Sequence, residues 1–118
     1  MQKLTNKEEE LMQHFWAHGA MFVRDVVLLY DDPKPHFNTI STMVRTLETK
    51  GFLSHEAFCN TYRYLPIISQ EEFSIGVLGN VVTRYFENSY KQAVSALIEE
   101  EKISIEELEE LLRKVQNQ

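Results

Sequence analysis

The chain has 118 residues, of which 43% are hydrophobic, so it is long enough for one compact domain or for two small modules that share a core. No apolar run approaches the roughly 18 residues of a membrane span, and the N-terminus lacks the basic and then apolar pattern of a signal peptide. A single cysteine excludes an intramolecular disulfide and a cysteine-based zinc site. We therefore expect a cytoplasmic protein without membrane insertion.

The net charge of −6 is unevenly distributed along the chain. Residues 1–68 hold 7 basic and 8 acidic side chains, whereas residues 69–118 hold 5 basic and 10 acidic ones. The first part is close to neutral, so a nucleic-acid partner is compatible with it despite the acidic total. Affinity for such a partner would be moderate for one chain and would depend on dimerisation.

Two predicted helices open the chain. Thr5-Asn-Lys-Glu8 is a capping box, so the first helix begins there, and it ends near His18 because Gly19 follows. A second helix is expected from Phe22 to Tyr30. The prolines of the segment 31–35 end it, because each disfavours helix in the residue before it.

The stretch Phe37–Leu53 predicts a third, amphipathic helix, which Gly51 ends. Its apolar positions follow the i, i+3, i+4, i+7 pattern and are Ile40, Met43, Val44 and Leu47. The opposite face is small and polar, with one guanidinium, and consists of Asn38, Thr42, Arg45 and Thr49. Such a face offers hydrogen-bonding groups for base edges and repels phosphate little, which indicates a DNA-recognition helix.

A β-hairpin is expected directly after this helix. Its strands cover residues 52–58 and 61–65, Cys59-Asn60 forms the turn with the positive φ expected at Asn60, and Pro66 closes it. A hairpin in this place is the wing of a winged helix-turn-helix fold. The side chains expected to contact DNA are Asn38, Thr39, Ser41, Thr42, Arg45 and Thr46 of the third helix, Lys34 before it, and His55 and Arg63 of the wing.

The remaining residues predict three helices with wide apolar faces and no second layer to cover them. Ser69, Ser89 and Ser104 are expected to cap these helices. Burial against an identical chain is the simplest solution. The residues expected at this dimer interface are Phe73, Val77, Val81, Tyr85, Leu97, Leu108, Leu111, Leu112 and Val115. We thus expect a mainly α chain with a DNA-binding domain at 1–68 and a helical dimerisation domain at 69–118.

Several segments together resemble the penicillinase-repressor family of bacterial winged-helix repressors, which includes BlaI, MecI and CopY. They are Leu4-Thr5, Glu10–Met12, Trp16, Val23–Val26, Asn38–Leu47, Lys50–Leu53, Tyr62–Pro66 and Ile105–Leu111. The resemblance implies a homodimer that binds a two-fold double-stranded DNA operator and represses transcription. It also implies that Thr39, Thr42 and Arg45 occupy recognition-helix positions, with Asn38 at a site often occupied by lysine.

The resemblance further implies two kinds of induction, and the sequence departs from both. In members that control β-lactam resistance, a membrane sensor-protease system leads to cleavage of an Asn-Phe bond in the dimerisation region. Ala96-Leu97 stands at the matching place, which argues against cleavage of the same specificity. Copper-responsive members carry a C-terminal Cys-x-Cys cluster, which this chain lacks.

Other functions have weaker support. No G-x-S-x-G, P-loop or H-E-x-x-H motif indicates an enzyme, and no cofactor is expected. His14 and His18 have the spacing to share a metal ion but lack further ligands, so no metal site is predicted. Cys59 could act as a redox switch or be an inert thiol. The alternatives left open are a winged-helix protein-interaction module and a ligand sensor with a pocket between wing and tail.

Overall fold

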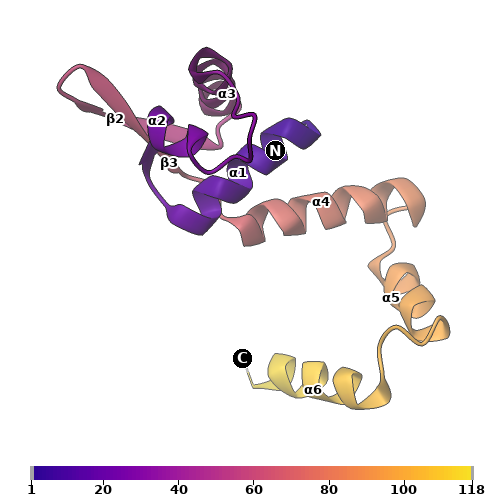
Figure 1. Ribbon diagram of the computed structural model, residues 1–118. Coiled ribbons are helices and arrows are strands. Elements are labelled where there is room, and N and C mark those ends of the chain that lie inside the picture. Colours follow the sequence, from indigo (N-terminus) through magenta and orange to yellow (C-terminus); the bar gives the residue numbers. More distant parts are fainter. Residues whose placement is uncertain (1, 118) are drawn as a thin grey trace. The chain divides into compact units, whose positions relative to one another are not determined.

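A computed structural model describes residues 2–117 of the chain. It is mainly helical with a small antiparallel sheet, which confirms the predicted winged helix-turn-helix with a helical tail (Figure 1). The elements in chain order are α1 (Asn6–His18), β1 (Met21–Phe22), α2 (Val23–Val27), α3 (Phe37–Thr49), β2 (Leu53–Phe58), β3 (Thr61–Pro66), α4 (Gln70–Tyr85), α5 (Tyr90–Glu99) and α6 (Ile105–Gln116).

The chain divides into two compact units, Met1–Ile75 and Gly76–Gln118. Helix α4 begins in the first unit and continues into the second. Its first turns belong with the winged helix, because the ring of Phe73 lies 5.5 Å from that of Trp16 and 5.8 Å from that of Phe52. The division of function at residue 68 stays a prediction.

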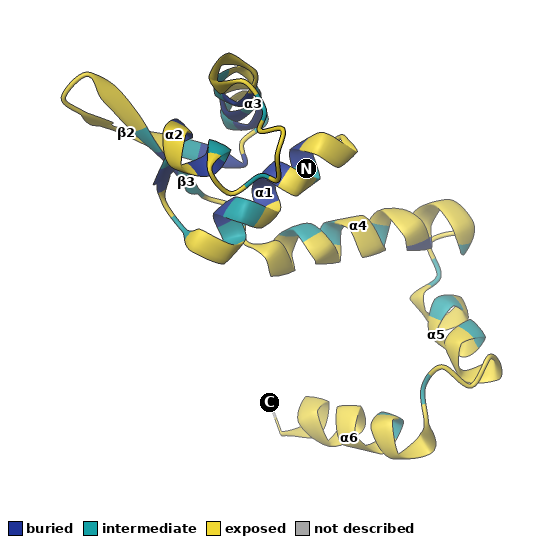
Figure 2. Cartoon of the chain, in the orientation of Figure 1, coloured by how far each residue is buried: buried dark blue, intermediate teal, exposed yellow. Residues whose placement is uncertain are grey.

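One apolar core holds the first unit together. It collects side chains from all three N-terminal helices and from the sheet, and the fully buried ones include Leu11, Phe15, Val26, Val44 and Phe52. Buried residues are concentrated in this unit, whereas α5 and α6 are mostly exposed (Figure 2).

The first helix follows its prediction closely. Thr5 and Glu8 form the reciprocal capping box, and Gly19 follows the last turn with φ of 78°. Glu8 is charged and yet buried, with 6% of its surface exposed. Its carboxylate also accepts a hydrogen bond from Lys50 Nζ at 2.8 Å, which compensates for the loss of water. This ion pair joins the start of α1 to the end of α3.

The predicted helix from Phe22 to Tyr30 is wrong in its extent. Met21 and Phe22 form strand β1, whose backbone pairs with Tyr64 and Arg63 of β3, and α2 covers only Val23–Val27. A two-residue strand leaves no periodic signal, and its partner lies about forty residues away in the sequence, so local pattern favoured one longer helix.

The hairpin of β2 and β3 extends beyond the helices of the first unit (Figure 1). Its register places His55 opposite Tyr64 and Glu56 opposite Arg63, so these pairs lie on opposite faces of the hairpin. In the turn, Cys59 rather than Asn60 takes the positive φ, at 51°, which corrects the prediction.

The three tail helices begin at the serines that were predicted to cap them. The side chains of Ser69, Ser89 and Ser104 accept hydrogen bonds from the backbone of Glu72, Gln92 and Glu107, respectively. In the second unit, only Val82 is buried among the large hydrophobic residues that the structure describes.

Candidate nucleic-acid interface

Helix α3 has the two faces that its sequence predicts. Ile40, Val44 and Leu47 are at most 1% exposed, which fixes the rotation of the helix against the core. The opposite positions are all exposed and are Asn38, Thr42, Arg45 and Thr49. The helix therefore presents small polar side chains and one guanidinium to solvent.

Hydrogen bonds within α3 order this exposed face. Arg45 Nε donates to the carbonyl oxygen of Ser41 at 3.2 Å, and Arg45 Nη2 donates to Thr42 Oγ1 at 3.4 Å. The hydroxyl of Thr46 donates to the Thr42 carbonyl, and that of Thr49 to the Arg45 carbonyl, both at 3.1 Å. The guanidinium lies along its own helix, and its remaining N–H groups have no partner among residues 2–117.

At the N-terminus of α3, His36 acts as the cap. Its Nδ1 accepts a hydrogen bond from the backbone N–H of Asn38 at 3.1 Å. The side chains of Asn38 and Thr39 are exposed in this first turn, next to Phe37, which is 50% exposed. This end of the helix is thus open to an approaching partner.

The basic residues predicted to hold phosphates all have intramolecular partners. His55 Nδ1 lies 2.6 Å from Glu48 Oε2, and Arg63 Nη2 donates to Glu56 Oε2 at 2.7 Å. Lys34 Nζ donates to the backbone carbonyl of Tyr30 at 2.6 Å. To bind phosphate, each would exchange its internal partner for an external one.

Arg63 is the most constrained of these three side chains. Its guanidinium lies over the ring of Phe58, 4.7 Å from the centroid, and Phe58 packs edge-on against Phe22. Its Nε is buried without a hydrogen-bond partner among the described residues. Arg63 therefore stabilises the hairpin in addition to any contact with a phosphate.

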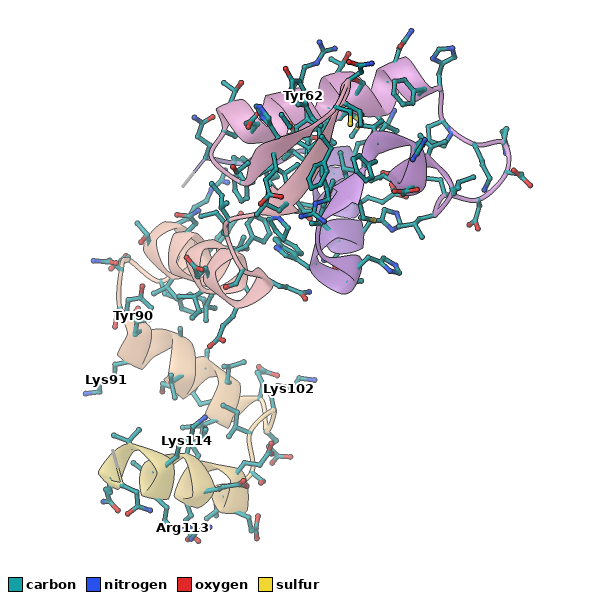
Figure 3. All side chains as sticks on the ribbon, turned by 90° about the vertical axis from the view of Figure 1, so that its left-hand side faces the viewer. Tyr62, Tyr90, Lys91, Lys102, Arg113 and Lys114 are labelled. Carbon is teal, nitrogen blue, oxygen red and sulfur yellow. The ribbon has the colours of Figure 1, made fainter. Side chains whose placement is uncertain are left out.

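Two exposed residues beside α3 were missed by the sequence reasoning. Arg24, in the first turn of α2, lies over the ring of Phe22 at 5.7 Å and has no carboxylate within 4.0 Å among residues 2–117. Tyr62, labelled in Figure 3, is 51% exposed and packs on His55 at 4.4 Å between ring centroids. The alternation of side chains along β3 places Tyr62 on the same face as Tyr64, but nearer the tip of the wing. This pattern could have indicated that Tyr62 is an exposed aromatic residue.

A groove of about 280 Å³ separates α3 from the wing within the first unit. Its lining comes from three places in the chain and consists of Phe22, Val23, Arg24, Phe37, Ser41, Asn60, Thr61, Tyr62 and Tyr64. Tyr64 is only 5% exposed, and burial, followed by the nearby Glu48, raises the pKa of its phenol.

Several aromatic residues of the first unit have structural roles. Phe15 is fully buried, and Trp16 donates its indole N–H to the Ile68 carbonyl at 2.8 Å, as core aromatics should. The ring of His14 packs against Tyr30 at 4.7 Å. Within residues 2–117, no group of three or more His, Cys, Asp or Glu side chains is placed to hold a metal ion.

Comparison with known proteins decides what this arrangement is. The sequence profile described as "Penicillinase repressor" matches residues 4–117, almost the whole chain. The chain belongs to the penicillinase repressor family. Members of this family are transcriptional repressors and not enzymes, as the sequence predicted.

The repressor is also similar to methicillin resistance regulatory proteins named MecI. It is 22% identical to MecI of Staphylococcus aureus strain N315 over 112 residues, which cover 92% of this chain and 89% of that protein. It is 22% identical to MecI of Mammaliicoccus sciuri over 114 residues, with the same shares covered. The similarity therefore extends through both the winged helix and the tail.

In the repressor's second unit, the candidate dimer residues that lie there are largely exposed. The exposed fraction is 38% for Val81 and 68% for Tyr85, and the stripe of α6 is similarly open: Leu111, Leu112 and Val115. Phe73 differs, because it packs against the winged helix. Its place in a dimer interface stays a prediction.

The candidate cleavage site Ala96-Leu97 lies inside helix α5. Leu97 is 44% exposed, but its peptide bond is held in a regular helix. Proteases act on locally unfolded chain, so this bond becomes a substrate only when α5 opens.

Among the described residues, no helix is long and apolar enough to cross a membrane.

Proposed function

We propose that this repressor binds a two-fold DNA operator as a homodimer and prevents transcription by occluding the promoter. The observation that carries the proposal is the exposed face of α3, where Thr42 and Arg45 lie opposite a buried stripe and next to a hairpin wing. In a winged helix-turn-helix, this helix enters the major groove, where guanidinium and hydroxyl groups distinguish bases. Asn38 and Thr39, at its first turn, support base or phosphate contacts.

The rest of the site supplies the less specific contacts. Ser41 and Thr46 flank the reading face, and Lys34, His55 and Arg63 are proposed to hold phosphates on either side of it. Since each of these side chains already has an internal partner, each contributes less to affinity than an unpaired side chain would. The dimer must therefore supply much of the affinity through two simultaneous half-site contacts.

Dimerisation through the tail is supported by its uncovered apolar surface. Side chains of α5 and α6 such as Leu97, Ile105 and Leu112 are 44%, 71% and 59% exposed in a single chain. Apolar surface of this extent on a monomer marks an interface. In the proposed dimer, the tail fixes the separation of the two α3 helices and hence the spacing of the half-sites.

The similarity to MecI suggests what is regulated and how repression ends. We propose that the repressor acts in the cytoplasm on antibiotic-resistance genes and that a membrane sensor-protease system is a candidate partner. Any cleavage at Ala96-Leu97 requires a specificity other than Asn-Phe and the opening of α5. Anything else that weakens the dimer would also release DNA, because one half-site contact alone is weak.

Fluorescence anisotropy with the DNA upstream of the repressor's own gene tests the proposal. We expect Arg45→Ala to weaken binding by roughly 5- to 150-fold per half-site, the value of one good base contact. Lys102→Ala, at an exposed position between α5 and α6, removes the same charge from the tail and is the matched control. It should leave affinity within about twofold, the scale of a distant surface charge.

The alternative function is a protein-interaction module in which the polar face of α3 is ordinary surface. It predicts that wild type and Arg45→Ala bind DNA equally weakly, with little dependence on salt. That result would remove the operator-binding proposal. Sedimentation of the full chain as a monomer at micromolar concentration would separately remove the dimer.

A further inference from the structure

We propose that the groove between α3 and the wing binds a small aromatic carboxylate, and that this ligand competes with DNA. The groove lies wholly within the first unit, and its volume of about 280 Å³ is just below the roughly 300–1,000 Å³ of ligand sites. This size suits a single substituted ring. Ligand binding stands on the groove itself, whereas competition with DNA rests on the proposed function.

The first argument is a hydroxyl group without a partner, on a side chain that is otherwise buried. Only 5% of the surface of Tyr64 is exposed. Its phenol oxygen has no hydrogen-bond partner among residues 2–117. That oxygen is not among the side-chain atoms fully enclosed by protein, and Tyr64 lines the groove. A polar group so placed is left to bond with whatever occupies the groove.

The second argument is the charge of the lining. Arg24 is the one charged residue among those that line the groove, and no aspartate or glutamate lines it. The guanidinium of Arg24 forms no ion pair within the described chain. Ser41 and Thr61 add hydroxyl groups to the same wall. Guanidinium and hydroxyl donors together favour a carboxylate over a cation.

The third argument is the aromatic residues that line the groove beside these donors. Phe22, Phe37 and Tyr62 come from three separate elements and line the same groove. Aromatic walls select a planar ring through edge and face contacts. A bare inorganic anion would leave this surface uncovered, so we assign an aromatic ring to the ligand as well as a carboxylate.

Competition with DNA follows from where the lining residues sit. Phe37 and Ser41 belong to the first two turns of α3, and Asn60 and Thr61 to the tip of the wing. The proposed DNA complex uses both elements. A ligand between them occupies space next to the reading face and adds negative charge where phosphate would approach.

An NMR titration of the full chain with 4-hydroxybenzoate tests binding directly. We expect saturable shifts of the backbone amides of groove residues such as Ser41 and Thr61, with a Kd of roughly 1 mM for so small a ligand. Arg24→Ala should weaken binding at least about tenfold, the value of a hydrogen bond to a charged group. Tyr64→Phe, which keeps the ring in the core, should weaken it several-fold.

Three controls make the result decisive. Arg84 also lies over an aromatic ring, that of Tyr85 at 5.6 Å, but in the second unit, so Arg84→Ala should leave binding unchanged. The neutral 4-hydroxybenzamide should bind about tenfold more weakly. Absence of saturable shifts, or equal losses in Arg24→Ala and Arg84→Ala, overturns the site, and equal shifts with inorganic phosphate overturn the aromatic requirement.

The effect on DNA is measured separately by anisotropy with the upstream DNA. Saturating 4-hydroxybenzoate should raise the apparent Kd for DNA, and the benzamide should not. Groove shifts without a change in DNA affinity overturn the competition. If the chain binds no specific DNA with or without ligand, the proposed function fails, while the amide shifts still decide whether the groove is a ligand site.

Discussion

The ion pair between Glu8 and Lys50 gives the sharpest test of how the winged helix is held together. Lys50 Nζ lies 2.8 Å from Glu8 Oε1, and the two side chains are 21% and 8% exposed. We predict that Lys50→Met, which keeps the apolar stem, destabilises the fold because it leaves a buried carboxylate with only the capping-box hydrogen bond from the Thr5 backbone N–H.

The magnitude follows from that burial. Removing one partner of a fully buried pair costs roughly 3–5 kcal/mol, and the partial exposure of Lys50 reduces this to about 2–3 kcal/mol. Glu8→Gln keeps a side chain that can complete the capping box and should cost about 1–2 kcal/mol. The double variant should be less destabilised than the sum of the two, by about 1–2 kcal/mol, because the pair is lost only once.

Urea unfolding of the four proteins, all at one protein concentration, measures this cycle. Burial opposes ionisation of Glu8, but the hydrogen bonds from Lys50 and from the Thr5 backbone outweigh it, so the pKa of Glu8 is below its ordinary 4.5. Its contribution is therefore complete above pH 4.5 and is lost as pH falls through the lowered value. Additive effects, or a Glu8→Gln deficit that persists in acid, would refute the reasoning.

Three further predictions concern the turn after α3, the core and the tail. Gly51→Ala should lower stability by about 1–2 kcal/mol in denaturant unfolding, because φ is +86° there although the added Cβ meets nothing within 4 Å, and Gly51→Asn should lose less. Burial and then Glu10 raise the pKa of Tyr30 to about 12. The free energy of unfolding relative to that of Tyr30→Phe should therefore be constant below pH 10 and decline between pH 10 and 12. A constant difference across this range would contradict the prediction. Leu112→Asp should raise the dimer dissociation constant at least about a hundredfold in sedimentation. The near-ultraviolet spectrum of the winged helix should stay unchanged. An unaffected dimer would exclude α6 from the interface.

Local sequence patterns predicted the parts of the fold that local forces determine. The capping residues Thr5 and Ser104 each satisfy backbone groups within three residues, so sequence spacing alone identifies them. The stripe from Ile40 to Leu47 likewise follows from one helical period. The exposed polar face of α3 could be predicted for the same reason, because it is the complement of that stripe.

What depended on distant partners could not be read from the sequence. The pairing of Phe22 with Arg63 shortens α2, and the packing of Phe73 onto Trp16 joins the start of α4 to the winged helix. The internal partners of His55 and Arg63 in the wing could not be predicted either, since Glu48 meets His55 only once helix and hairpin are placed. Arg24 gained significance in the same way, through a groove built from three separate segments.

The C-terminal half of α3 is attached to its surroundings on two sides. Lys50 binds Glu8 of α1, and Glu48 binds His55 of β2, so the last turn is tied to both a helix and the wing. A helix fixed in this way has already lost its conformational freedom during folding, and little more is lost when a partner is bound. In the proposed complex, discrimination between operators would then come from rigid fit, and a wrong base would meet a surface that does not adapt to it.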